Sequence, residues 1–327
     1  MREITYREAV QEALAEELER DPKVFLIGED IGPFGGTNKA TLGLYDRFGP
    51  ERVRNTPISE SAIIGAAIGA AVTGMRPVAE IMFVDFIAVG MDQIANQAAK
   101  LRYMTGGQTK LPLTIRTPGG AGRSSAAQHA QSLEAWLLHV PGLYVVMPAT
   151  PKDVKGLIKS AVRNDNPTVV IEHKLLYNTS GPVPEGEYNV PIGLADVKRE
   201  GTDLTVIATS RMVLHTLKAA GRLKEEGISI EVVDPRTLHP LDMDTIGGSV
   251  EKTGRVLIVH EACERCGFGA ELAARIGTEL FDYLDAPIQR LAAANVPMPF
   301  APVLESYAVP QMSDIVRVAK GMMKGEM

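Results

Sequence analysis

Residues 5–28, TYREAVQEALAEELERDPKVFLIG, contain the pattern that decides the fold. Thr5 and Glu8 match a helix-capping box, and apolar residues then recur at helical spacing. Pro22 ends this predicted helix, and the apolar run 24–27 predicts a fully buried strand. An amphipathic helix followed by a continuous apolar strand is typical of a parallel sheet covered by helices.

The same alternation continues along the chain. Further strands are predicted at 77–83, 111–116, 143–147, 168–172, 204–208, 230–233, 256–259 and 288–291. Further helices are predicted at 61–73, 87–104, 131–138, 151–164, 211–226, 242–252, 267–281 and 311–323. This order favours an α/β fold with two parallel or mostly parallel, helix-covered sheets, in which ligands bind at the carboxyl ends of strands.

A stretch rich in proline and glycine interrupts the pattern between residues 173 and 200. We interpret it as a linker, because its prolines break every regular periodicity. The sequence therefore predicts a first domain at 1–175, a linker at 176–200 and a second domain at 201–327. A length of 327 residues agrees with two domains.

Composition excludes several classes of protein. The formal net charge is −6, which argues against a nucleic-acid binder and against a polybasic membrane patch. The longest apolar stretch, 62–75, is too short to span a membrane, and the charged N-terminal segment lacks the apolar core of a signal peptide. Two cysteines, Cys263 and Cys266, exclude a disulfide framework. We expect a cytoplasmic protein.

Two glutamates lie where a ligand is expected. Glu29 follows the first predicted strand, and Glu60 stands at a helix start beside a helix of small apolar residues. Glu60 is either a first-turn glutamate favoured by the helix dipole or a buried carboxyl group. Burial would raise its pKa and let it share a proton with a ligand nitrogen.

Aromatic and glycine-rich segments offer further candidates. Phe83 and Phe86 belong either to the core or to a platform for a flat heterocycle. The loop 118–129 is either mobile or a phosphate cradle, although it lacks the Walker pattern. His129, at its end, is either structural or catalytic.

The spacing His260-x-x-Cys263-x-x-Cys266 is only a weak indication of zinc binding or redox chemistry. The glycines of Gly267-Phe268-Gly269 are equally weak as a nucleotide motif. From these pieces, two interpretations remain open. One is an enzyme subunit that holds a flat, charged cofactor, and the other is a non-catalytic α/β binding or assembly subunit.

Six segments, taken together, resemble one family over essentially the whole chain. They are TPISE (56–60), EIMFVDF (80–86), DQIANQAAKLRYMTGG (92–107), AAQH (126–129), KGLIKSAVRNDNPTVVIEHKLLY (155–177) and NVPMPFAPVLE (295–305). The family is the beta subunit of the thiamine-diphosphate-dependent first component of 2-oxo acid dehydrogenase complexes. It includes pyruvate, branched-chain 2-oxo acid and acetoin dehydrogenases.

This resemblance implies a thiamine-diphosphate-binding pyrimidine domain followed by a transketolase C-terminal-like domain. It also implies an α2β2 heterotetramer that holds thiamine diphosphate between unlike chains. The family's relatives bind Mg²⁺ and the diphosphate through a Gly-Asp-Gly motif, which this sequence lacks. We therefore expect the Mg²⁺ on an alpha subunit, and we expect the isolated chain to be inactive.

The resemblance also assigns roles to individual residues. Glu60 matches the glutamate that bonds the aminopyrimidine ring nitrogen and so promotes loss of the thiazolium proton. Phe86 matches the aromatic residue that packs on the aminopyrimidine, and His129 matches the active-site histidine that serves the lipoyl group. Glu29 matches an acidic residue between the two active sites. A structural potassium ion in some members implies a site at Leu113, Ala161, Asn164 and Asn166.

The reaction implied is cleavage of a 2-oxo acid or of acetoin, with transfer of the acyl fragment to lipoamide. Three stretches, ISESAIIGAA, MFVDF and EHKLLY, look most like the acetoin branch. The short loop 28–41 departs from that branch, so pyruvate and branched-chain 2-oxo acids stay open. The lipoyl-bearing second component is expected to dock on the C-terminal domain, near 290–327.

Overall fold

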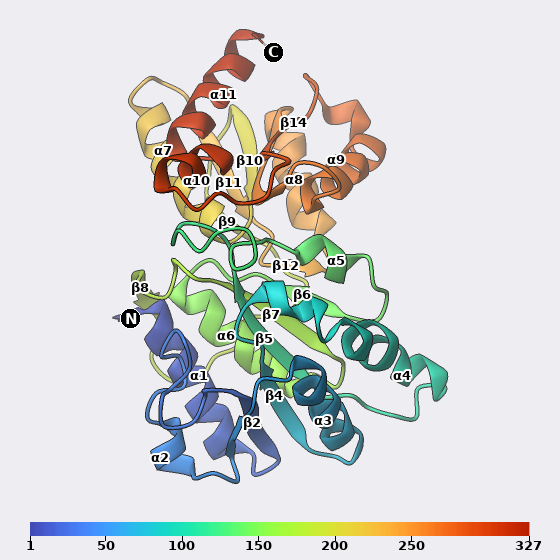
Figure 1. Cartoon of the computed structure of the whole chain (residues 1–327). Helices are drawn as coiled ribbons and strands as arrows, with labels where there is room; N and C mark the ends of the chain where they lie inside the picture. The colour runs from blue at the N-terminus through green and yellow to red at the C-terminus, as the bar shows by residue number, and fades with distance from the viewer. Residues whose placement is uncertain (327) are drawn as a thin grey trace. The chain divides into compact units, whose positions relative to one another are not determined.

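The computed structural model describes residues 1–326 and divides into two compact units (Figure 1). The first unit comprises Met1–Gly119 and Trp136–Ile192, and the second comprises Gly120–Ala135 and the chain from Gly193 onward. Each unit contains a mostly parallel sheet with helices, so the predicted α/β fold class is confirmed.

The first unit is built on a parallel sheet with the strand order β6-β7-β5-β4-β2-β3. These strands are β2 (Val24–Glu29), β3 (Val53–Thr56), β4 (Arg76–Glu80), β5 (Thr114–Gly119), β6 (Tyr144–Val146) and β7 (Thr168–His173). Because all neighbouring pairs run parallel, their carboxyl ends meet at one edge. A separate antiparallel pair joins β1 (Arg2–Thr5) to β8 (Ser180–Val183).

Two helices of the first unit, α1 (Tyr6–Arg20) and α6 (Pro151–Arg163), begin at the caps that the sequence predicts. The other helices are α2 (Leu44–Phe48), α3 (Glu60–Val72) and α4 (Ala99–Met104), and α5 (Glu134–Leu138) crosses the boundary between the units. The capping box at Thr5 and Glu8 is present, with each residue bonded to the other's backbone N–H. Thr150 caps α6 by accepting a hydrogen bond from Asp153 N.

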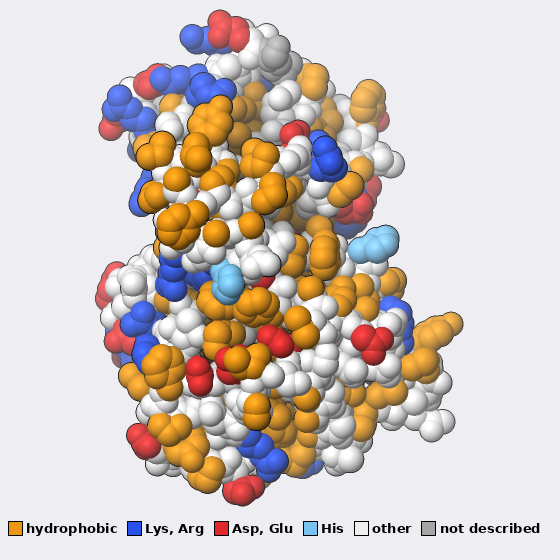
Figure 2. Space-filling model, viewed as in Figure 1, with side chains coloured by type: hydrophobic (Ala, Val, Ile, Leu, Met, Phe, Trp, Pro, Cys, Tyr) orange, Lys and Arg blue, Asp and Glu red, His pale blue; other side chains and the backbone are white. Residues whose placement is uncertain are grey.

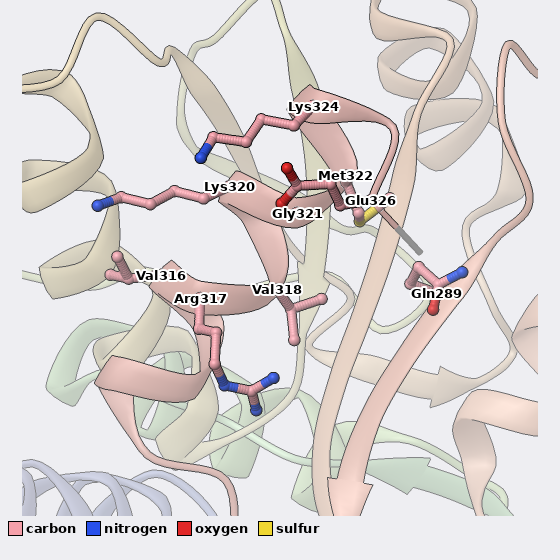
Figure 3. Close-up of a pocket in the computed structure, with 9 residues that line it drawn as sticks. All are labelled: Gln289, Val316, Arg317, Val318, Lys320, Gly321, Met322, Lys324 and Glu326. Atoms are coloured by element: carbon pink, nitrogen blue, oxygen red, sulfur yellow. The ribbon is translucent and has the colours of Figure 1, made fainter.

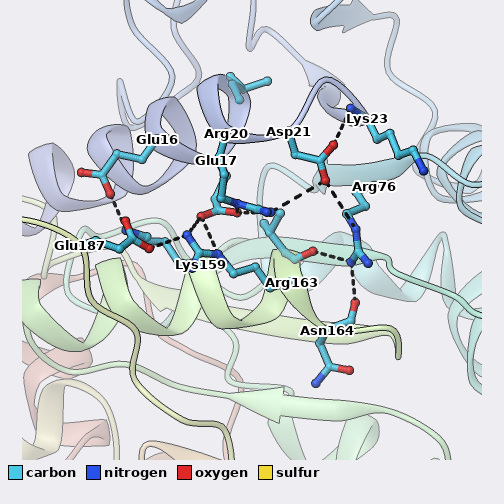
Figure 4. Close-up of polar contacts among 12 residues, drawn as sticks. Glu16, Glu17, Arg20, Asp21, Lys23, Arg76, Lys159, Arg163, Asn164 and Glu187 are labelled. Carbon is cyan, nitrogen blue, oxygen red and sulfur yellow. Dashed lines mark hydrogen bonds and ion pairs between the residues drawn. The ribbon is translucent and has the colours of Figure 1, made fainter.

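Ion pairs join α1 to α6 (Figure 4). The Nζ atom of Lys159, which is fully buried, lies 2.6 Å from carboxylate oxygens of both Glu16 and Glu187. Arg163 Nη2 lies 2.5 Å from Glu17 and 2.6 Å from Glu187. Buried cations that are paired in this way hold the two helices in a fixed register.

The second unit has a sheet with the strand order β14-β13-β10-β11-β9, in which only the pair β11–β9 is antiparallel. The strands of this sheet are β9 (Asp196–Arg199), β10 (Leu204–Ala208), β11 (Ile230–Asp234), β13 (Val256–Cys263) and β14 (Gln289–Ala293), and the second unit also contains the short strand β12 (Thr237–His239). Its helices are α7 (Arg211–Lys224), α8 (Met243–Thr253), α9 (Phe268–Glu279), α10 (Pro302–Ala308) and α11 (Met312–Lys324). No helix within residues 1–326 is long and apolar enough to cross a membrane.

Two predicted segments differ in detail from the structure. The helix expected at 87–104 is present from residue 91, with a π-helical segment, η2 (Gln93–Ala98), before α4, whereas its first residues belong to a 3₁₀ segment, η1 (Val84–Ala88), and a turn. The stretch interpreted as a linker contains β8 and β9, which pair with β1 and β11. Prolines are tolerated in β8 because it is an edge strand.

Candidate functional site

Glu60 is the first residue of α3, directly after β3 and a short exposed connection. Its side chain is 9% exposed. Within residues 1–326, its carboxylate forms no hydrogen bond or ion pair. The helix dipole favours a negative charge at this position. The carboxylate oxygens are not among the buried atoms that lack a partner, so water reaches them and a ligand donor could replace that water. Glu60 is therefore available to a donor that the chain itself does not supply.

Glu29 is the last residue of β2. In the parallel pairing of β2 with β3, it lies opposite Thr56, the last residue of β3. Burial raises the pKa of Glu29, and the negative charges of Asp30 and Glu60 raise it further. The parallel register thus brings Glu29 and Glu60 close enough for their charges to repel. The sequence predicted both residues for the site, and the structure brings them together.

Phe86 belongs to η1, and its ring meets that of Phe83 edge to face, with centroids 5.9 Å apart. The segment after η1 packs on α3: Ser61 Oγ donates to the Val89 carbonyl at 2.7 Å. A Cβ atom added to Gly90 would lie 2.4 Å from Ile64 Cδ1, so glycine permits this close approach. The packing places the Phe86 segment beside the first turn of α3.

The groups around Glu60 fit one face and one edge of a flat heterocycle. A carboxylate without a protein donor suits a ring nitrogen that shares a proton. The half-buried ring of Phe86 offers an apolar face for stacking, and Ile58 is 73% exposed next to Glu60 in the chain. The aminopyrimidine of thiamine diphosphate combines these features, so the residues present fit that part of the cofactor.

His129 belongs to the second unit, although it lies within the range expected for the first domain. It is half-buried in a loop, residues 120–131, that has no helix or strand. We call this segment the His129 loop. A hydrogen bond from Gly120 N to the Gln131 carbonyl closes the base of the loop at 3.0 Å. Glu60, Glu29 and Phe86 belong to the first unit.

A buried ionic cluster lies at the ends of β4, β5 and β7, and the sequence analysis did not find it. Arg116, 2% exposed, donates to Glu172 at 2.6 and 2.9 Å and to Glu80 at 2.8 Å. The hydroxyl group of Tyr177 also donates to Glu172. An arginine inside an otherwise apolar strand, with glutamates ending two neighbouring strands, was the available signal.

In this cluster, burial and the charges of neighbouring groups shift the pKa values in opposite directions. Burial raises the pKa of Glu80, and the positive charge of Arg116 opposes that shift. Burial on its own would lower the pKa of Arg116, but the charges of Glu172 and Glu80 outweigh it and the net shift is upward. The cluster is therefore held by charge-assisted hydrogen bonds within the fold, and its carboxylates already have donors.

The residues predicted for potassium surround the C-terminal end of α6 and the start of β5: they are Leu113, Ala161, Asn164 and Asn166. Arg76 Nη1 donates to the carbonyl oxygens of Val162 and Asn164 at 3.0 and 3.2 Å (Figure 4). Arg102 Nη1 donates to Asn166 Oδ1 at 2.5 Å. Arg76 also pairs with Asp165 at 2.7 Å, so the charges here are partly balanced, and the potassium site stays a prediction.

His260 is fully buried, and the structure explains the glycines that follow it. A Cβ atom added to Gly267 or Gly269 would lie 2.7 or 2.6 Å from the imidazole ring. Burial, followed by the charge of Arg290, lowers the pKa of His260 to about 4. No group of three or more His, Cys, Asp or Glu side chains within the described part of the chain can hold a metal ion. The glycines thus make room for a ring rather than for a nucleotide.

The second unit also carries a cavity of about 650 Å³ along α11 (Figure 3). Three basic side chains line it: Arg317, Lys320 and Lys324. Lys320 and Lys324 extend in the same direction, whereas Arg317 points away from them. This cavity falls within the region expected to contact a second component.

Comparisons with known proteins agree with this organisation. Residues 2–180 match the family model described as transketolase, pyrimidine binding domain, and residues 193–315 match the transketolase C-terminal domain. A solved structure described as "Split gene transketolase, inactive beta4 tetramer" aligns with a TM-score of 0.81 at 24% identity, covering 99% of each chain. That likeness shows the fold.

Several sequence relatives share a higher identity with this chain than that solved structure does. The beta-2 subunit of the mitochondrial pyruvate dehydrogenase E1 component of Oryza sativa is 47% identical over 323 residues, 98% of this chain and 86% of that protein. Subunit beta of the Cupriavidus necator acetoin:2,6-dichlorophenolindophenol oxidoreductase is 46% identical, covering 99% and 98%. Subunit beta of the Bacillus subtilis 2-oxoisovalerate dehydrogenase is 49% identical, covering 93% and 94%.

Proposed function

Because the chain belongs to the family of E1 beta subunits of thiamine-dependent 2-oxo acid and acetoin dehydrogenases, we propose that it provides the aminopyrimidine side of a shared active site. The observation that carries this proposal is Glu60, a residue only 9% exposed whose carboxylate accepts no hydrogen bond from residues 1–326, beside the aromatic segment that holds Phe86. Glu29 shares this edge of the sheet and adds negative charge.

Glu60 and Phe86 are the residues that would hold the cofactor ring. When bound, thiamine diphosphate supplies an electron sink for cleavage of the bond beside the substrate carbonyl group. Glu60 holds a proton at the ring nitrogen, and Phe86 excludes water from one face of the ring. Burial, and then the charges of Asp30 and Glu60, raise the pKa of Glu29 at the same edge.

Replacement of Glu60 tests this assignment. In an assembled enzyme, Glu60→Ala should lower turnover by about 10²-fold or more, since general acid–base groups contribute on that scale. Glu60→Gln should lose nearly as much, because an amide cannot exchange the proton. Far-ultraviolet circular dichroism should remain unchanged. Full turnover in Glu60→Ala would refute the assignment.

An alpha subunit is required to complete the site. The sequence contains no Gly-Asp-Gly motif, so we assign the diphosphate and its Mg²⁺ to the alpha chain of an α2β2 heterotetramer. Calorimetric titration of the isolated chain with thiamine diphosphate and Mg²⁺ should show weak binding and no turnover. Tight binding by the isolated chain would contradict this division.

Acetoin is our first choice of substrate, on the stretches ISESAIIGAA, MFVDF and EHKLLY. Relatives named for pyruvate, acetoin and 2-oxoisovalerate are 47%, 46% and 49% identical, so overall similarity does not separate the three. The test is co-expression with the alpha chain, followed by dye reduction with each substrate in turn. The highest kcat/KM with acetoin supports this choice, and a higher value with either 2-oxo acid replaces it.

We assign His129 to transfer of the acyl fragment to the lipoyl group, where an imidazole can give or take a proton. His129→Ala should therefore impair reductive acylation of lipoyl domain more than dye reduction, and equal losses would exclude this role. The second component docks, in this proposal, on residues 290–327, where the basic side chains of α11 line the cavity.

A further inference from the structure

Glu305 is a buried glutamate on α10, and its carboxylate is turned toward the His129 loop. It is 3% exposed, whereas Val303 and Tyr307 on the same helix are 80% and 89% exposed. Figure 2 shows hydrophobic side chains gathered over α10 on the outer face. Glu305 therefore lies on the face of α10 that packs into the second unit, and a charge buried there needs donors.

Those donors are backbone N–H groups of the loop. Gly122 N donates to Glu305 Oε1 at 2.7 Å, and Ser124 N donates to Oε2 at 3.0 Å. The two bonds use both carboxylate oxygens. Because each joins a charged acceptor to a backbone amide in a partly buried place, each is stronger than an ordinary neutral hydrogen bond.

Glu261, at the end of β13, fixes the loop one residue earlier. Its Oε1 accepts a hydrogen bond from Ala121 N at 2.5 Å. Ala121 and Ala130 pack together in a buried apolar cluster with Ala293 and Val309. The base of the loop is thus held by apolar packing, and its first arm is held by two carboxylates from separate elements.

The loop needs such support because its backbone is strained. Ser124 and Ala126 have φ angles of +51° and +59°, in the left-handed region that is unfavourable for a residue with a side chain. Gly120 and Gly122 also have positive φ angles. Alternation of such residues turns successive N–H groups inward, which resembles an anion-binding nest. Here the protein's own carboxylates fill that nest, so the loop's amides are not available to a phosphate.

We propose that Glu305, supported by Glu261, is a positioning residue for His129. This inference rests on the proposed function, because it takes the lipoyl-transfer role of His129 as given. Glu305 holds residues 122 and 124, and the base of the loop holds residue 130, so that the segment between them keeps one conformation. His129 is consequently fixed to the second unit by contacts that α10 and β13 provide.

The test measures loop order and catalysis on the same preparations. Hydrogen exchange of peptides covering 120–131 is followed in the full chain assembled with its alpha subunit. Glu305→Ala should speed exchange of these amides at least tenfold and should lower kcat for reductive acylation of lipoyl domain about tenfold. Dye reduction and its KM should change less than twofold.

Two further variants sharpen the result. Glu305→Gln keeps one acceptor oxygen but turns an NH₂ group toward the second amide, so both effects should be intermediate. Glu271 is an exposed glutamate on α9, and Glu271→Gln is the matched control, which should change neither the exchange rate nor the acylation rate. If Glu305→Ala does not fold, the same measurements on Glu305→Gln decide the question.

The possible outcomes distinguish a failure of the positioning role of Glu305 from a failure of the proposed lipoyl-transfer role of His129. Unchanged exchange in Glu305→Ala overturns the positioning role. Faster exchange with full acylation also overturns it, provided that His129→Ala loses acylation. Full acylation in His129→Ala refutes the proposed role of His129 itself, and the exchange data still report whether Glu305 holds the loop.

Discussion

Glu60 in the first unit and Glu305 in the second are both buried glutamates, but their carboxylates are used in opposite ways. Glu305 accepts two backbone hydrogen bonds from the His129 loop. Glu60 accepts none from residues 1–326, and the charge of Glu29 lies nearby. A buried carboxylate with internal donors stabilises a conformation, whereas one without them is left for a ligand. The pattern of donors, rather than burial, separates structural from catalytic acids here.

The largest effect is expected where satisfied carboxylates lose their donor. Arg116→Ala leaves Glu172 and Glu80 buried without their cation, and breaking a buried ion pair in this way costs about 3–5 kcal/mol. Chemical denaturation should show that loss in the free energy of unfolding of the first unit. A loss below about 1 kcal/mol would mean that burial of these acids does not depend on internal donors.

Glu134 tests whether an unpaired buried acid can exist without a ligand. It is 2% exposed, its Oε2 atom has no hydrogen-bond partner, and burial raises its pKa to about 7, with a smaller contribution from Glu261. Ionisation is therefore more costly in the folded state than in the unfolded state. Stability should fall as pH rises from about 4.5 to about 7, and the loss should persist above pH 7.

Glu134→Gln removes that ionisation. The variant should be about as stable as the parent at pH 4.5 and more stable at pH 8, by on the order of 3 kcal/mol, since burial raises the pKa from 4.5 to about 7 and each pKa unit is worth about 1.4 kcal/mol. Urea denaturation at four pH values between 4.5 and 8 measures the difference, with Glu271→Gln as the control. A difference that does not vary with pH would show that Glu134 is not the titrating group.

The smallest of these effects concerns the aromatic ring beside Glu60. Phe86→Ala should weaken thiamine diphosphate binding about tenfold in the assembled enzyme, because a stacking contact contributes roughly 1 kcal/mol beyond its buried area. Titration calorimetry gives the Kd, and the melting temperature without cofactor should change little. Phe83→Ala is the matched control, and an equal loss of affinity there would mean that Phe86 has no special position.

Long regular elements were predictable from the sequence, and close packing was not. The capping box of α1 and the cap of α6 were correct, because local side chain–backbone bonds fix them. The helix predicted at 87–104 begins only at residue 91, since Gly90 packs against Ile64 and the chain turns there. Strands β8 and β9 were missed because their pairing partners, β1 and β11, lie far away in sequence.

Among the site residues, too, local placement could be predicted from the sequence, whereas long-range contacts could not. Glu29 and Glu60 could be placed together because parallel strands end at one edge of a sheet. Assignment of His129 to the second unit could not be foreseen, since Glu261 and Glu305 bond to the loop over separations of 140 and more residues. A glutamate that accepts backbone hydrogens carries no local sequence signal.

The melting temperature of Glu60→Gln, measured with and without saturating thiamine diphosphate and Mg²⁺ in the assembled enzyme, tests the central claim most directly. Without cofactor, the variant should melt at the temperature of the parent or above it, because a carboxylate without donors beside Glu29 is replaced by a neutral amide. With cofactor, most of the parent's stabilisation should be absent. A variant that melts about 5 °C or more below the parent without cofactor, yet gains the parent's full stabilisation with it, would contradict the account.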